Sequence, residues 1–141
     1  MSPTKYIYND IIFDSKPEIA YYIWLTDNNI KFIYKPKTNI QYEFDGKTFN
    51  YYPDFYLVET DQLIEIKGDH FFKDDGTMYC PFRDSDWTDE YYYKMCQKYE
   101  LKHQTMIKNN VKILKSEQYN IYLKYISEKY GKKYLDSFKH T

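Results

Sequence analysis

The chain has 141 residues, enough for one domain with a substantial core, and its formal net charge is −1. The mean hydropathy of −0.83 and the lack of a long apolar run exclude a transmembrane helix, and the amino terminus has no signal-peptide pattern. We therefore expect a soluble cytoplasmic protein without a membrane partner. Cys80 and Cys96 are predicted to be free thiols, and the three scattered histidines do not form a zinc motif with them.

The first predicted helix runs from about residue 16 to Asp27. Ser15 precedes it and Glu18 follows three residues later, which is the spacing of a capping box, and a proline at position 17 is tolerated in a first turn. Two interpretations of Glu18 stay open. Its carboxylate either caps its own helix or points into a functional site as a third acid.

Strands are predicted at residues 30–35 and 39–44, and Asp45-Gly46 is a tight-turn signal that leads into a longer strand from Thr48 to Val58. A polar turn follows, and the apolar pattern resumes from Leu63 to Lys67. Two β-rich runs around a short polar turn predict a hairpin. We expect the strands of residues 40–67 to form a meander.

Three charged side chains interrupt the apolar pattern of this hairpin. Side chains alternate between faces along a strand, so Glu65 and Lys67 share one face. Ile64 and Ile66 then point to the other. A register that sets Asp54 near Glu65 would bring both carboxylates and the ammonium into one pocket. Buried charge is costly unless it is paired, and adjacent carboxylates repel unless a cation neutralises them.

These residue types suit metal-assisted hydrolysis of a phosphodiester. Mg²⁺ favours one or two carboxylates together with water and phosphate oxygens, so we expect Asp54 and Glu65 to bind Mg²⁺ or Mn²⁺. The backbone carbonyl of Ile66 could complete the metal shell. Lys67 would orient the attacking water or stabilise negative charge in the transition state. The alternative is a polar-faced hairpin with a solvated Glu65–Lys67 pair, which would be weak.

The remaining elements are predicted in chain order. Residues 69–88 show no period, and we expect an irregular segment that covers the pocket or contacts substrate, with Trp87 pinning it to the core. A second helix is predicted at about 89–109, followed by a short strand at 111–114. A last amphipathic helix runs from about 117 to 129.

Charge is distributed unevenly along the chain. Residues 1–90 contain 9 Lys+Arg and 17 Asp+Glu, giving −8, whereas residues 91–141 contain 11 Lys and 4 Asp+Glu, giving +7. This asymmetry predicts a basic side that faces nucleic acid beside an acidic metal-binding side. Lys94, Lys98 and Lys102 of the second helix are the candidate phosphate contacts. The alternative is that these lysines only solvate an amphipathic helix.

The hairpin motif resembles that of the PD-(D/E)XK nuclease superfamily, in Pro53-Asp54 and Glu65-Ile66-Lys67 with ten residues between Asp54 and Glu65. The segment from Tyr8 to Glu18 is similar to the opening of small phage-type members, in which a hairpin leads into a helix that bears a glutamate. The resemblance follows the order of elements over about residues 6–115. It implies a restriction-endonuclease-like α/β fold, in which helices flank a mixed β-sheet.

The resemblance also implies a divalent-metal dependence and a nucleic-acid substrate. Asp54, Glu65 and Lys67 carry over as catalytic residues, and Glu18 carries over as a further metal ligand. Related nucleases often place a Lys or Gln of the second core helix at the site, and the sequence does not say which residue this would be here.

We therefore predict a single nuclease-like domain over residues 1–141 that hydrolyses DNA phosphodiester bonds with Mg²⁺ or Mn²⁺. It would be an endonuclease of phage or mobile-element origin, acting in the host cytoplasm, and a homodimer would let it cut both strands. Two alternatives stay open. One is a catalytically silent nuclease fold that binds DNA or protein, and the other is an RNA-directed nuclease.

Overall fold

The computed structural model describes residues 4–140, which form a mixed α/β structure. The helices are α1 (Lys16–Asp27), α2 (Asp89–Lys108) and α3 (Ser116–Tyr130), with the 3-10 turns η1 (Asp69–Phe71) and η2 (Leu135–Phe138). The strands are β1 (Lys5–Tyr8), β2 (Ile11–Phe13), β3 (Phe32–Tyr34), β4 (Gln41–Phe44), β5 (Lys47–Asn50), β6 (Phe55–Leu57), β7 (Gln62–Ile66), β8 (Lys112–Leu114) and β9 (Lys139–His140). Thus the predicted α/β class is confirmed.

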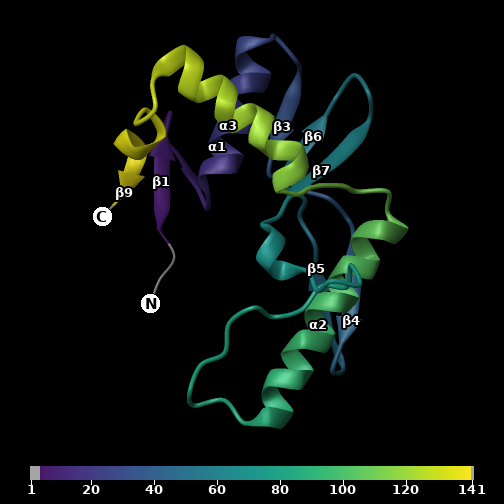
Figure 1. Cartoon of the computed structure of the whole chain (residues 1–141). Helices are drawn as coiled ribbons and strands as arrows, with labels where there is room; N and C mark the ends of the chain where they lie inside the picture. The colour runs from purple at the N-terminus through teal and green to yellow at the C-terminus, as the bar shows by residue number, and fades with distance from the viewer. Residues whose placement is uncertain (1–3, 141) are drawn as a thin grey trace.

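The central sheet has the order β3-β6-β7-β8. β6 pairs antiparallel with both β3 and β7, whereas β7 pairs parallel with β8, so the sheet is mixed as predicted. α1 and α3 lie together against one face of it (Figure 1). Buried apolar side chains fill the space between them: Tyr21, Leu25, Phe55, Ile64, Ile66 and Leu114.

The predicted hairpin is formed by β6 and β7. Its register pairs Phe55 with Ile64, and the backbone N–H of Asp54 donates to the carbonyl of Ile64 at 3.0 Å. Continued by one residue, this register sets Asp54 across from Glu65, and the hydrogen bond from the Ile66 N–H to the Asp54 carboxylate places the two residues together. Ile64 and Ile66 point into the core under α1 and α3, as the alternation predicts.

The expected meander of residues 40–67 is wrong. β4 and β5 form a separate two-stranded sheet beside α2, while β6 leaves them and pairs with β3 (Figure 1). The break falls at Tyr51–Pro53, between β5 and β6. Proline cannot donate to a sheet ladder, and the fully buried ring of Tyr51 packs with Met78 and Met106 rather than continuing the strand.

The two chain ends meet in a third sheet of order β2-β1-β9. Its core contains Phe13, Ile19 and Ile126, so it packs against both α1 and α3. The three helices begin and end within two residues of the sequence-based boundaries. None of the helices within residues 4–140 has the length and apolar content needed to cross a membrane.

The expectation that residues 69–88 cover the pocket holds only for η1, whose His70 and Phe71 line it, and none of residues 72–88 is among the lining residues. After passing beside the middle of α2, where Met78 and Cys80 are buried, this later segment returns in a wide loop to the amino-terminal end of that helix (Figure 1). The expectation that Trp87 would pin it to the core is also wrong. Trp87 is only half-buried and packs edge-on against Tyr91 of α2, with ring centroids 4.9 Å apart. Cys80 and Cys96 are free thiols, as predicted.

Candidate active site

A pocket of about 590 Å³ opens between α1, the β6–β7 hairpin and α2. It contains eight acidic and lysine side chains: Lys5, Asp14, Glu18, Lys35, Asp54, Glu65, Lys67 and Lys102. Two other pockets, of about 500 and 550 Å³, hold two such side chains each. Asp54, Glu65, Lys67 and Glu18 therefore share a single cavity, as the predicted site requires.

Asp54 lies at the start of β6 and is 4% exposed. Two donors hold its carboxylate: Lys35 Nζ donates to Oδ1 at 2.8 Å, and the backbone N–H of Ile66 donates to Oδ2 at 2.8 Å. The second contact exists because β6 and β7 are neighbours in the sheet. It fixes the orientation of the carboxylate through a backbone group that cannot move independently.

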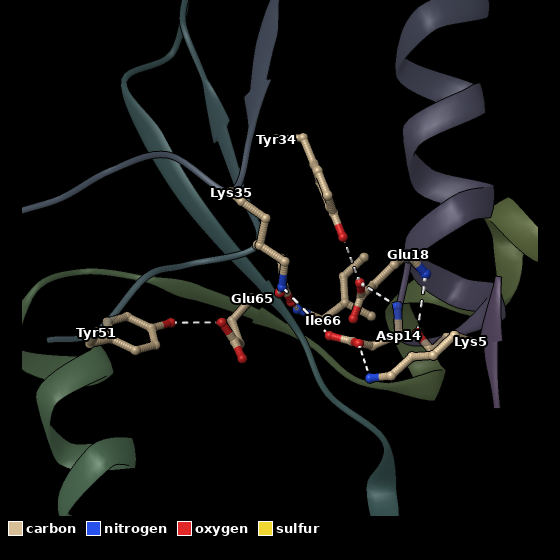
Figure 2. Close-up of polar contacts among 10 residues, drawn as sticks. Lys5, Asp14, Glu18, Tyr34, Lys35, Tyr51, Glu65 and Ile66 are labelled. Carbon is tan, nitrogen blue, oxygen red and sulfur yellow. Dashed lines mark hydrogen bonds and ion pairs between the residues drawn. The ribbon is translucent and has the colours of Figure 1, made fainter. Parts of the chain in front are cut away.

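Glu65 is 6% exposed, on the pocket face of β7. The hydroxyl of Tyr51 donates to its Oε1 at 2.8 Å (Figure 2). Burial raises the pKa of Glu65 to about 8, and the negative charge of Asp54 adds to the increase, while Lys67 and the Tyr51 hydrogen bond oppose it. The positive charge near Glu65 therefore does not offset the effects of burial and of Asp54 on its carboxylate.

Glu18 projects from the first turn of α1 and is 5% exposed. Ser15 Oγ caps the helix by accepting from the Glu18 N–H at 3.4 Å, whereas the Glu18 carboxylate accepts from Tyr34 Oη at 3.1 Å and from the Asp14 N–H at 3.4 Å (Figure 2). Burial raises the pKa of Glu18 to about 7, with the charge of Asp54 as the next cause. Of the two interpretations of this residue, the geometry favours the one in which its carboxylate belongs to the pocket.

The three lysines of α2 have different surroundings. Lys94 forms an ion pair with Asp45 at 2.8 Å, and Lys98 lies over the ring of Phe49 at 3.8 Å, so both contact the β4–β5 hairpin. Lys102 alone lines the pocket. Burial lowers the pKa of Lys102, and the positive charges of neighbouring lysines lower it further, against the attraction of Glu65 and Asp54. Lys102 is thus the residue of the second helix that reaches the site.

Lys67 follows β7 at the mouth of the pocket. Its ammonium lies 4.1 Å from the ring centroid of Phe71, in cation–π geometry. Among residues 4–140, neither Lys67 nor Lys102 forms an ion pair or a hydrogen bond through its side chain. Both ammonium groups are therefore available to an anion entering the pocket.

The donor set of the pocket suits a hard divalent cation. Within residues 4–140, no group of three or more His, Cys, Asp or Glu side chains is arranged to hold a metal ion. Mg²⁺ does not need three, since it takes one or two carboxylates and keeps several waters. Asp54 and Glu65 offer two, and Glu18 and Ile66 line the same pocket. The raised pKa values of Glu18 and Glu65 are consistent with a cation site, because a bound cation would stabilise both ionised carboxylates and lower both pKa values.

Sequence reasoning missed three side chains that hold the acids in place. Lys35 follows β3 and pairs with Asp54, while Tyr34 and Tyr51 donate to Glu18 and Glu65. With 19 tyrosines in the chain, the sequence does not indicate which of them would contact the acids. The contact between Lys35 and Asp54 could not be predicted from the sequence either, since it depends on β3 pairing with β6.

No protein-family model, curated protein or solved structure matches this chain. The pocket itself is therefore the basis for a functional assignment.

Proposed function

We propose that the protein is a divalent-metal-dependent nuclease that hydrolyses phosphodiester bonds in DNA, with a restriction-endonuclease-like core. The observation that carries this proposal is the meeting of two buried carboxylates, Asp54 and Glu65, with the ammonium of Lys67 in one pocket. A protein that needed only to fold would gain little from this arrangement, because buried like charges reduce stability.

Each residue has a defined task in this reaction. Asp54 and Glu65 would hold the metal, which when bound supplies an acidified water and neutralises charge on the phosphate. Lys67 would stabilise the negative charge that develops on the phosphate oxygens, in a partly buried place where such an interaction is stronger than in water. Lys102 adds a second ammonium on the α2 side of the pocket.

Substrate affinity would come mainly from lysine contacts with phosphates. Such contacts depend on salt and tolerate different sequences. The sequence does not distinguish DNA from RNA, so RNA is tested beside DNA. Mg²⁺ or Mn²⁺ suits the oxygen ligands, and a second copy of the chain would be needed for cleavage of both strands at one encounter.

The second candidate function is a binding module that has the nuclease fold and no cleavage activity. The ion pair between Lys35 and Asp54 favours it, because one oxygen of the principal acid is already neutralised by the protein. A binding module would retain nucleic acid without any metal-linked turnover.

The test is cleavage of linear, nicked, branched and single-stranded DNA and of matched RNA, with and without Mg²⁺ or Mn²⁺. We expect metal-dependent products from at least one DNA substrate. Asp54→Asn removes the charge of the metal-binding acid and should abolish them. Asp61→Asn is the matched control, because Asp61 is exposed in the turn of the same hairpin, where it accepts from Tyr56 Oη.

Two results would contradict the proposal. One is a lack of metal-dependent cleavage on every substrate at high protein concentration. The other is equal cleavage by the Asp54→Asn variant, which would point to a contaminating enzyme or to another site. Binding that depends on salt, with no turnover, would support the binding module instead.

A further inference from the structure

Lys35 occupies a position that a cation would need. Its ammonium lies 2.8 Å from Asp54 Oδ1 and 3.9 Å from Asp14 Oδ2, and it points into the pocket between β3 and α1 (Figure 2). Mg²⁺ binds carboxylate oxygens at about 2.1 Å. A metal ion and this ammonium on the same oxygen would therefore lie within about 5 Å of each other, with strong repulsion between them.

The carboxylate cannot avoid this conflict by turning away. Asp54 Oδ2 is held at 2.8 Å by the backbone N–H of Ile66, inside the central sheet. Lys35 can move, because its side chain is 40% exposed and has a flexible four-carbon stem. The second oxygen near it, on Asp14, belongs to a side chain that is 52% exposed. The ammonium of Lys35 thus has a second acidic neighbour in the pocket lining, and the other oxygen of Asp14 pairs with Lys5.

The backbone at Lys35 is unusual in a way that supports a specific role. Seven non-glycine residues among residues 4–140 have a positive φ, and six of them are Asn or Asp, which adopt this left-handed conformation with little strain. Lys35 is the exception, with φ of 52°. Its N–H donates to the carbonyl of Asp54 at 2.7 Å, so backbone and side chain both bind the same residue. The residues that usually adopt this conformation, Asn, Asp and Gly, carry no positive charge and could not neutralise Asp54.

We propose that Lys35 is a built-in competitor for the metal: its ammonium neutralises Asp54 when the pocket holds no cation, and it is expelled toward Asp14 when a divalent ion binds. This inference rests on the proposed metal site. It predicts that the protein binds its metal more weakly than two buried carboxylates would on their own. It also predicts that metal binding releases the ammonium of Lys35 from Asp54 and leaves it beside the exposed carboxylate of Asp14.

The first measurement is a calorimetric titration with Mn²⁺. Lys35→Met keeps the length of the side chain and removes the charge, so we expect it to bind Mn²⁺ about tenfold more tightly than the wild-type protein, or more. Lys37→Met is the matched control, since Lys37 is exposed two residues away and does not line this pocket. It should bind Mn²⁺ as the wild-type protein does.

The second measurement uses the unmodified protein and is informative even if Lys35→Met does not fold. Lysines are acetylated briefly with an activated ester, with and without saturating Mn²⁺, and the modified sites are quantified by mass spectrometry. We expect the acetylation rate of Lys35 to rise several-fold on addition of Mn²⁺, while that of Lys37 stays constant.

The inference is wrong if Mn²⁺ binds and leaves the reactivity of Lys35 unchanged. It is also wrong if folded Lys35→Met binds Mn²⁺ no more tightly than the wild-type protein, or if neither protein binds Mn²⁺. The proposed nuclease function fails separately. Tight Mn²⁺ binding with release of Lys35 and no cleavage of any nucleic acid would refute the nuclease and leave the competitor in place.

Discussion

Replacing Glu65 with glutamine should stabilise the metal-free protein above neutral pH. The Glu65 carboxylate is buried beside Asp54, and its pKa is raised from 4.5 to about 8, by burial first and by the charge of Asp54 second. Glutamine has nearly the same shape, and its amide oxygen can still accept from the hydroxyl of Tyr51. The substitution therefore removes the charge and keeps the hydrogen bond.

The sign of the effect follows from proton linkage. Between pH 4.5 and about 8 the folded protein holds a proton on Glu65 that the unfolded chain has released, so the free energy of unfolding falls as pH rises through this range. At about 1.36 kcal/mol for each pKa unit, the loss amounts to roughly 5 kcal/mol at most. The Glu65→Gln variant has no carboxylate at this position, so its free energy of unfolding does not fall for this reason. We expect the two proteins to be equally stable near pH 4.5 and the variant to be more stable by roughly 2–5 kcal/mol at pH 9.

The assay is urea unfolding in EDTA at a series of pH values from 4.5 to 9. Glu59→Gln is the control, because Glu59 is exposed in the turn of the same hairpin and its replacement should leave the pH profile unchanged. With saturating Mg²⁺ in place of EDTA, the wild-type protein should regain stability at high pH and the Glu65→Gln variant should gain less. A stability difference that does not change with pH would refute the reasoning, as would a variant less stable than the wild type at pH 9.

Three further predictions use the same structure. Tyr51→Phe removes the donor to Glu65 and should lower the free energy of unfolding by about 1–3 kcal/mol in urea titrations, and an unchanged midpoint would show that the hydrogen bond contributes nothing. Phe55→Ala, at a fully buried position of the central sheet, should cost about 3–5 kcal/mol in the same assay, whereas a loss under 1 kcal/mol would contradict the packing. Lys102→Gln should weaken DNA binding in Ca²⁺ and reduce the slope of log affinity against log salt by about 1, and Lys94→Gln, whose ammonium is already paired, should change it less. Equal slopes for the two variants would remove Lys102 from the DNA contacts.

The elements that the sequence predicts well are those set by local rules. The β6–β7 hairpin follows from two alternating runs around a polar turn, and the alternation sets which face of β7 buries Ile64 and Ile66, while the pairing register itself comes from the structure. Ser15 and Thr88 are the N-caps that immediately precede α1 and α2, and their side-chain oxygens accept backbone N–H groups of the first turn. Such signals lie within a few residues of the feature they determine.

The features that sequence reasoning missed depend on contacts between distant segments. The separation of β5 from β6 depends on the space for the Tyr51 ring between Met78 and Met106, which are far along the chain. The position of Lys35 depends on β3 joining the sheet beside β6. Residues 69–88 were expected near the pocket because they follow the motif. His70 and Phe71 line it, but the buried side chain of Cys80 and the hydrogen bond from Tyr92 Oη to the Cys80 carbonyl hold the later part beside α2. In these cases tertiary packing overrides the local pattern.

The charge balance of the pocket favours an anionic ligand whether or not a metal is bound. Four acids and four lysines line it, so the formal charges cancel: Asp14, Glu18, Asp54 and Glu65 against Lys5, Lys35, Lys67 and Lys102. At pH 7, however, the raised pKa values of Glu18 and Glu65 favour protonation of these acids, which shifts the charge of the metal-free pocket toward positive, while the lowered pKa of Lys102 opposes this shift. A divalent cation would draw off those protons and add two charges of its own, which leaves the pocket positive. Lysine side chains in the pocket therefore attract phosphate with or without the metal. The metal would add a catalytic function rather than the attraction itself.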